Sequence, residues 1–149
     1  MQNIIETLQN NRHNYYLKIF KEIDTYIYRQ KRYNLSFSIA SVYAEDENVI
    51  DIIKLESAIR KTDKIIKLSN NLLCIVYDIT SDTTFVKTAE NSNKKLQQIH
   101  CKKKFFMSVV ESNEFNTNYL EMTNTLFERL EYAITNKLYN TVIYEDYII

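Results

Sequence analysis

Apolar residues recur every three or four positions through the first part of the chain, which is the spacing of one helix face. The pattern ends in the polar stretch 29–32, whose basic residues are typical of a helix C-terminus. The sequence therefore predicts a leading helical segment over residues 1–33, with a helix between Arg12 and Tyr33. Its apolar positions are Tyr15, Tyr16, Ile19, Phe20, Ile23, Tyr26 and Ile27.

A strand and a short helix are expected next. Residues 35–45 alternate larger apolar side chains with small or polar ones, as a strand does. Asp46 is the expected N-cap of a helix. The apolar face of that helix is predicted to consist of Val49, Ile52, Leu55 and Ile59.

The middle of the chain predicts a hairpin. Residues 65–68 and 72–79 are short apolar runs separated by Ser69-Asn70-Asn71. Asparagine tolerates the positive φ values of a tight hairpin turn, so we expect such a turn here. The chain contains no glycine that could take this role.

The remaining pattern predicts two helices and two strands. Ser81 or Asp82 opens a helix, and residues 105–110 form a strand. Asn118 and Glu121 have the spacing of a capping box at the start of the next helix. Residues 141–144 form the last strand.

The order of these elements defines the expected fold. After the leading helix it begins β-α-β-β-α-β, the unit of ferredoxin-like folds, in which helices cover one face of an antiparallel sheet. One helix and one strand are added at the C-terminal end. The prediction is a single α/β (α+β) domain over residues 1–149.

Composition excludes several function classes. Without glycine, the chain cannot form a P-loop, a dinucleotide-binding fingerprint or a nucleophile elbow. Lysine plus arginine equals aspartate plus glutamate at 19 each, so no basic excess points to nucleic acid. We interpret the lysines at 102–104 as a solvated strand edge. No apolar run approaches a membrane span, and no targeting signal is visible, so we expect a cytoplasmic protein without membrane insertion.

Neither metal nor disulfide chemistry is indicated. Cys74 lies in an apolar run and is interpreted as a core residue. His100 adjoins Cys101, but adjacent residues rarely chelate one metal and no second Cys/His pair exists. We expect no metal and no cofactor. No Ser/His/Asp or Cys/His set suggests another enzyme class.

Several short motifs occur in one order along the chain. Residues 6–15 contain Thr7, the Asn11-Arg12 pair and an aromatic at Tyr15, and arginines precede the first strand. Residues 60–63 form an R-x-x-D motif five residues before Ser69-Asn70-Asn71-Leu72-Leu73. The strand at 106–110 and the terminal residues Tyr132, Asn140 and Val142 follow. This order resembles the GGDEF family, the diguanylate cyclases of bacterial signalling, which condense two GTP into cyclic di-GMP.

The resemblance also implies that the cyclase chemistry is lost. Ser41 and Tyr43 occupy the positions of the two strand aspartates that the family uses near its metal. Ser69, Asn70, Asn71, Leu72 and Leu73 occupy the GGDEF signature itself. Only 18 residues separate Ser41 from Arg60, which leaves room for one helix where the family places its nucleotide-binding segment. We therefore expect a degenerate domain without GTP turnover.

Two functions remain open. In the family, R-x-x-D at the position of Arg60 and Asp63 binds cyclic di-GMP, so the chain could be a receptor. The alternative for these two residues is a local structural pair or a helix C-terminus. The preferred function is a regulatory domain that contacts a protein partner or a second copy of itself. Tyrosines favour interfaces, and the leading segment carries Tyr15, Tyr16, Tyr26, Tyr28 and Tyr33.

Overall fold

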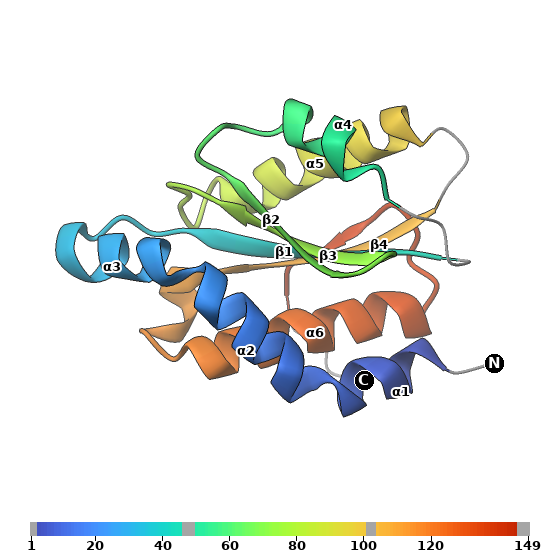
Figure 1. The fold of residues 1–149 in the computed structure, drawn as a ribbon, viewed down its shortest axis with the longest axis horizontal. Coiled ribbons are helices and arrows are strands. Elements are labelled where there is room, and N and C mark those ends of the chain that lie inside the picture. The colour runs from blue at the N-terminus through green and yellow to red at the C-terminus, as the bar shows by residue number, and fades with distance from the viewer. Residues whose placement is uncertain (1–2, 46–49, 101–103, 146–149) are drawn as a thin grey trace.

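The computed structural model describes residues 3–45, 50–100 and 104–145. A five-stranded sheet lies between two layers of helices (Figure 1). The helices are α1 (Ile4–Asn10), α2 (Arg12–Glu22), α3 (Asp24–Tyr33), α4 (Ile52–Ala58), α5 (Phe85–Ile99), the short 3₁₀ helix η1 (Ser112–Phe115) and α6 (Tyr119–Thr135). The strands are β1 (Ser38–Ala44), β2 (Lys64–Ser69), β3 (Leu72–Tyr77), β4 (Phe105–Glu111) and β5 (Val142–Ile143).

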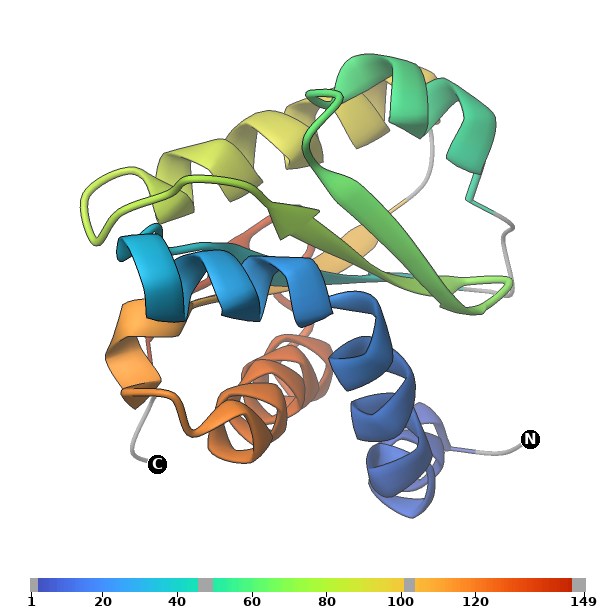
Figure 2. The same cartoon turned by 60° about the vertical axis from the view of Figure 1, so that its left-hand side comes forward.

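The sheet has the predicted topology. Its strand order is β2-β3-β1-β4-β5, with β1 antiparallel to both β3 and β4 and β5 parallel to β4. The β-α-β-β-α-β unit is formed by β1, α4, β2, β3, α5 and β4, and both of its helices lie on one face (Figures 1 and 2). The leading helices and α6 cover the opposite face, so both faces of the sheet pack against helices, and the edge strand β2 stays partly exposed.

Each strand contributes alternate side chains to two cores, because successive side chains of a strand point to opposite faces. The core under α4 and α5 contains Ala40, Val42, Leu73, Ile75, Leu96, Met107 and Val109. The core under α2, α3 and α6 contains Ile19, Tyr26, Phe37, Ile39, Cys74, Val76, Leu126 and Phe127. Cys74 is the buried core residue that the sequence predicted.

The leading segment differs from the single helix expected over residues 12–33. The chain bends at Ile23, which has non-helical dihedral angles and is buried. The bend places Ile19 of α2 and Tyr26 of α3 in the same core although the two helices run in different directions. A further helix, α1, precedes them, and Asn3 caps it by accepting a hydrogen bond from the Ile5 N–H.

Two other helices begin later than expected. The helix after β1 starts at Ile52, and its N-cap is Asp51, whose side chain accepts a hydrogen bond from the Lys54 N–H. The expected cap Asp46 and Val49 lie outside the described residues. The next helix starts at Phe85, because Ser81 and Thr84 first close a turn in which the Ser81 N–H donates to the Thr84 hydroxyl. At α6, Asn118 accepts a hydrogen bond from the Glu121 N–H, as the capping pattern predicted.

Asparagine does replace glycine at tight points of the backbone, but not in the β2–β3 hairpin. Asn34, Asn116 and Asn140 have positive φ, and Asn34 ends α3 in the left-handed conformation. Neither Asn70 nor Asn71 does, so the expectation for the hairpin was wrong. The register shifts between residues 67 and 69, and this irregularity lets the turn close without left-handed residues.

Candidate functional site

Arg60 and Asp63 lie in the loop between α4 and β2 and form the local pair that was one of the two expectations for them. The Arg60 guanidinium contacts both Asp63 carboxylate oxygens, with Nε–Oδ2 at 3.2 Å and Nη2–Oδ1 at 3.1 Å. The backbone N–H of Arg60 also donates to Asp63 Oδ2, at 3.2 Å. The Asp63 side chain is 3% exposed, whereas that of Arg60 is 53% exposed. Asp63 therefore orders the loop, and Arg60 keeps one side open to solvent.

Asp78, directly after β3, joins this pair to the leading segment. Its N–H donates to Asp63 Oδ1 at 2.9 Å, and its carbonyl accepts from Arg60 Nη2 at 2.5 Å. Its carboxylate forms an ion pair with Arg29 of α3 at 2.9 Å. The Tyr26 hydroxyl of α3 donates to the Thr62 carbonyl at 2.7 Å. Helix α3 is thus attached to the R-x-x-D loop at two points.

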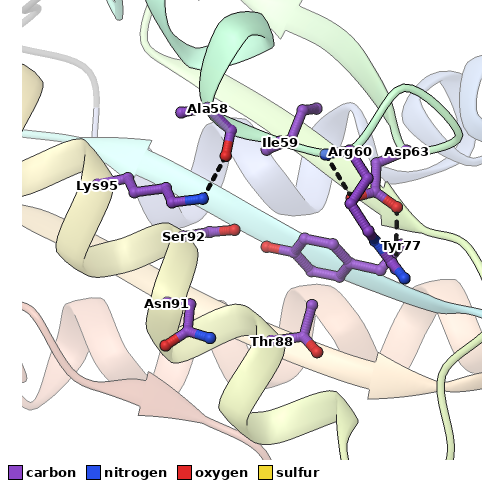
Figure 3. A pocket seen from close by; sticks show the side chains of 9 residues that line it. All are labelled: Ala58, Ile59, Arg60, Asp63, Tyr77, Thr88, Asn91, Ser92 and Lys95. Carbon is purple, nitrogen blue, oxygen red and sulfur yellow. Dashed lines mark hydrogen bonds and ion pairs between the residues drawn. The ribbon is translucent and has the colours of Figure 1, made fainter.

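A cavity of about 430 Å³ opens between this loop and α5 (Figure 3). One side of it is formed by the α4–β2 connection and the other by α5, with a tyrosine from β3 between them. Its lining residues are Ala58, Ile59, Arg60, Asp63, Tyr77, Thr88, Asn91, Ser92 and Lys95. Two cations and one anion among them leave the lining with a net charge of +1.

Tyr77 and Lys95 are the chemically notable groups of the cavity. The Tyr77 side chain is 1% exposed, and its hydroxyl points toward the Ser92 side chain of α5. Burial raises the pKa of this hydroxyl, so it stays protonated and can donate. The Lys95 side chain extends from α5 toward α4, where its ammonium donates a hydrogen bond to the Ala58 carbonyl.

Sequence reasoning missed these residues, although a signal for the α5 side was present. Thr88, Asn91, Ser92 and Lys95 recur every three or four positions on α5 and form a polar stripe on a helix identified only by its apolar face. Tyr77 gave no such signal, because it ends an apolar strand and looked like any core aromatic.

The positions that resemble the cyclase signature lie at the other end of the β2–β3 hairpin. Tyr43 pairs with Leu72 across the β1–β3 ladder, and the Ala44 N–H donates to the Asn71 carbonyl at 2.9 Å. The structure therefore brings Tyr43, Asn71 and Leu72 together. Ser69, Asn70 and Leu73 flank them in the same hairpin.

Ser41 lies deeper in the sheet than this group. It is fully buried between Cys74 and Ser108, and its hydroxyl lies 2.5 Å from that of Ser108. The Ser108 hydroxyl in turn donates to the Leu126 carbonyl of α6. This chain of hydrogen bonds fixes Ser41 as part of the packing between sheet and helix.

The side chains at this end of the sheet are mainly aromatic, and the Glu45 carboxylate just after β1 accepts a hydrogen bond from the Tyr139 hydroxyl at 3.3 Å. Tyr43 stacks on Phe106 with ring centres 6.2 Å apart, and Phe106 contacts Tyr139 at 4.8 Å. The Lys104 ammonium lies over the Tyr139 ring, at 4.6 Å. Cys101, Lys102 and Lys103, which belong to the expected Cys/His pair and lysine edge, lie outside the described residues. Within 3–45, 50–100 and 104–145, no three His, Cys, Asp or Glu residues are grouped as metal ligands would be.

Glu111, at the end of β4, is a buried carboxyl group that the sequence did not single out. Its Oε2 accepts a hydrogen bond from the Thr80 hydroxyl at 2.6 Å, and its side chain caps the 3₁₀ helix η1. In the described part of the chain its Oε1 has no hydrogen-bond partner. Burial raises the pKa of Glu111 to about 7.

The tyrosines of the leading segment divide between core and surface. Tyr26 is buried, and Tyr15 packs on Phe127 with ring centres 5.7 Å apart. Tyr28 and Tyr33 are exposed and contact each other edge to face. Only part of this aromatic set is therefore available for contacts with another molecule. Among the described residues, no helix is long and apolar enough to span a bilayer.

Comparison with known proteins identifies the fold. No protein-family model matches the sequence, and no curated protein matches it. Among solved structures, the active GGEEF domain of a diguanylate cyclase from Vibrio cholerae matches with a TM-score of 0.69 at 13% identity, over 86% of this chain and 94% of that one.

Two further structures agree. A microbial GGDEF domain studied for its interaction with cyclic di-GMP matches with a TM-score of 0.69 at 10% identity, over 85% of this chain and 90% of that one. The diguanylate cyclase SiaD from Pseudomonas aeruginosa, in complex with its activator SiaC, matches with a TM-score of 0.68 at 12% identity, over 85% of this chain and 56% of that one. The chain therefore has the fold of the GGDEF domains of diguanylate cyclases.

Proposed function

We propose that this chain is a cytoplasmic GGDEF-like regulatory domain without diguanylate cyclase activity, which acts in bacterial signalling by binding another protein. The fold supports the GGDEF-like part of this proposal. The loss of activity is supported by the side chains at the hairpin end of the sheet, and the interaction by apolar groups on the surface.

The observation that carries the proposal is the chemistry of the hairpin end. Transfer of a nucleotidyl group from GTP needs Mg²⁺, which prefers carboxylate oxygens and water. At this end the chain presents the phenol of Tyr43, the amide of Asn71 and the alkyl group of Leu72. The hydroxyl of Ser41 is buried and already hydrogen-bonded. None of these groups replaces a carboxylate on a divalent cation. The Glu45 carboxylate just after β1 is hydrogen-bonded to Tyr139, and among the described residues it belongs to no group of three metal-ligating side chains.

The test is incubation of the purified protein with GTP and either Mg²⁺ or Mn²⁺, followed by chromatography of the nucleotides. We expect GTP to stay unchanged, as in a boiled sample of the same protein. An active GGEEF domain assayed in parallel shows that the conditions support turnover. Cyclic di-GMP above the boiled control contradicts the proposal.

The protein-binding part is supported by apolar side chains around the start of α6. Leu17 and Phe20, one turn apart on α2, are 52% and 41% exposed. Phe20 and Leu120 line a second surface cavity, of about 480 Å³, beside the α6 N-terminus. A group of exposed apolar side chains is typical of a surface that contacts another protein. SiaD, which shares the fold, was solved with an activator protein.

A second candidate function is reception of cyclic di-GMP at Arg60 and Asp63. The half-exposed guanidinium of Arg60 at the cavity rim favours it, because arginine binds phosphate or a guanine edge through a forked pair of donors. Against it stand the bonds that Arg60 already makes to Asp63 and Asp78. We therefore expect weak or absent binding.

Calorimetric titration with cyclic di-GMP decides between the two candidates. Arg60→Ala is the test variant, and Arg32→Ala, on the exposed end of α3, removes the same charge away from the cavity. A micromolar or tighter isotherm that disappears in Arg60→Ala and persists in Arg32→Ala establishes the receptor function. A flat titration excludes the receptor function.

A further inference from the structure

Helices α2 and α6 lie side by side in the layer that covers one face of the sheet (Figures 1 and 2). Arg12 at the start of α2 donates a hydrogen bond to Glu131 in the second half of α6, at 2.6 Å. Near the end of α2, Phe20 contacts Tyr119 at the start of α6, with ring centres 6.4 Å apart. The two helices therefore run in roughly opposite directions, and their outer sides form one continuous surface.

The middle of this surface is apolar. Leu17 and Phe20 of α2 and Leu120 of α6 are exposed there. Lys18 and Lys21, which are also exposed, lie within one turn of Leu17 on α2. We call this surface the α2–α6 face, and its exposed residues are Leu17, Lys18, Phe20, Lys21, Leu120, Glu121 and Glu128.

The charge of the α2–α6 face is divided between the two helices. Three basic residues and one acidic residue give α2 a charge of +2, whereas three glutamates and one arginine give α6 a charge of −2. The arginine of α6, Arg129, is buried and bonded to Glu114, so its charge does not reach the face. Likewise, the acidic residue of α2, Glu22, is bonded to Lys64 of β2. The face is thus basic on its α2 side and acidic on its α6 side.

A second copy of the same chain carries the surface that this pattern requires. If it is rotated by 180° about an axis along the groove between the helices, its α2 lies on the α6 of the first copy, and its α6 lies on the first α2. Lys18 and Lys21 of each copy then face the glutamates of the other, and the exposed apolar side chains meet at the centre. Such a contact is isologous, so every attraction occurs twice. Rotation about an axis across the helices places like charges together, so the charges select one orientation.

We propose that the α2–α6 face is the contact between two copies of this chain, related by a two-fold axis. This inference rests on the protein-binding part of the proposed function and names the partner. The face is short, because the 11 residues of α2 span about 16 Å. It is therefore smaller than the interface of a stable complex, which buries about 800 Å² on each partner. We expect a weak dimer, with a dissociation constant of about 10–100 µM.

The test exchanges the charges of the two sides. The α2 variant is Lys18→Glu with Lys21→Glu, and the α6 variant is Glu121→Lys with Glu128→Lys. In sedimentation equilibrium, each variant alone should self-associate about tenfold more weakly than wild type, because opposite charges across the contact become like charges. Raising NaCl from about 0.05 M to about 0.5 M should weaken the wild-type dimer, because salt screens exposed charges.

An equimolar mixture of the two variants separates this contact from a general effect of charge. The mixture should form a heterodimer at about the wild-type affinity, since both halves of the contact then join opposite charges. The control variant is Lys54→Glu with Lys87→Glu, which makes the same change of charge as the α2 variant but on α4 and α5. It should self-associate like wild type, and it should bind the α6 variant more weakly than the α2 variant does.

The folding of the variants is measured separately. Glu121 also accepts a hydrogen bond from the Asn118 amide at the start of α6, at 3.2 Å. The melting temperature of each variant is therefore compared with that of wild type before association is measured. If it falls in the α6 variant, Glu128→Lys alone takes its place in both experiments.

Three results overturn the proposal. They are a wild type that stays monomeric up to about 1 mM, a dimer that neither charge variant weakens, and a mixture of the two variants that binds no better than the control mixture. All three leave the GTP test and its outcome unaffected. Formation of cyclic di-GMP in that test would overturn the proposed function without any effect on self-association through the α2–α6 face.

Discussion

Glu111 illustrates how one buried side chain makes stability depend on pH. Its carboxyl is fully buried, and of its two oxygens Oε2 bonds to Thr80. Because burial disfavours the charge, the folded protein holds the proton up to about pH 7, whereas an unfolded chain releases it near the ordinary glutamate value of 4.5. Folding and protonation of this group therefore favour each other.

The expected effect follows from the proton balance. Between about pH 4.5 and 7 the folded state binds more protons at Glu111 than the unfolded state, so the free energy of unfolding falls as pH rises. The stabilisation from the proton on Glu111 is complete below about pH 4.5 and is lost above about pH 7. In total it is on the order of 3 kcal/mol. Urea unfolding of wild type and Glu111→Gln across this window measures it. The difference between the two proteins should grow with pH in favour of the variant, and a constant difference contradicts the prediction.

The asparagines give a second test at the scale of single residues. Asn34 has φ near 56° at the end of α3, where glycine has no steric cost. We expect Asn34→Gly to leave the free energy of unfolding unchanged or to raise it by up to about 1 kcal/mol.

Asn70→Gly is the matched comparison. Because Asn70 does not have a positive φ, glycine there only adds freedom to the unfolded chain. We expect a loss of about 0.5–1 kcal/mol. Chemical denaturation measures both variants, and an Asn70→Gly protein more stable than Asn34→Gly would contradict the assignment of the two backbone conformations.

At the scale of elements, the attachment of α3 to the R-x-x-D loop rests on Arg29 and Tyr26. Arg29→Ala leaves the Asp78 carboxylate buried without its ion-pair partner. We expect the free energy of unfolding to fall by about 1–3 kcal/mol. Arg32→Ala, in the exposed last turn of the same helix, should change it by less than about 0.5 kcal/mol.

Both variants can be measured by thermal and urea unfolding. A second readout is the NMR signals of residues 60–63, which should shift in Arg29→Ala and stay in place in Arg32→Ala. An equal loss in the two variants would mean that α3 is held by its apolar face alone.

The elements show what sequence could and could not predict. The sheet order followed from the sequence of apolar patterns, because each strand and helix had a clear period. The bend at Ile23 could not be foreseen, since an isoleucine at helical spacing fits a continuous helix equally well. The cavity was missed for a related reason: Tyr77 and the α5 stripe are brought together only by the packing of α5 on the sheet. The Arg60–Asp63 pair was found because both residues belong to one contiguous motif, R-x-x-D, which can be recognised without knowing the fold.

At the scale of the whole molecule, the sheet is covered on both faces, so contacts with another protein must use helix surfaces or sheet edges. Phe20 on α2 and Leu120 on α6 are exposed apolar positions that line the cavity beside the α6 N-terminus, and Leu17 is exposed one turn before Phe20. If this face pairs with a second copy of the chain, Leu17→Ser should lower self-association about tenfold, the effect of removing one buried leucine from an interface.

Sedimentation equilibrium measures this prediction. Ile53→Ser is the control, because Ile53 is 82% exposed on α4, on the opposite layer of the molecule. A monomeric wild type at all concentrations excludes the homodimer and assigns the contact to a different protein. Equal effects of the two variants would show that the α2 face has no special role.

Asp78 has a consequence for how binding events influence one another. Its carbonyl accepts a hydrogen bond from Arg60, and its carboxylate holds Arg29 of α3. A molecule that captures the Arg60 guanidinium competes with that carbonyl, and a protein that moves α3 disturbs the same residue from the other side. Thermodynamic linkage makes this influence reciprocal. If a molecule bound to Arg60 changes the affinity of the leading helices for a protein partner by some factor, the partner changes the affinity for that molecule by the same factor.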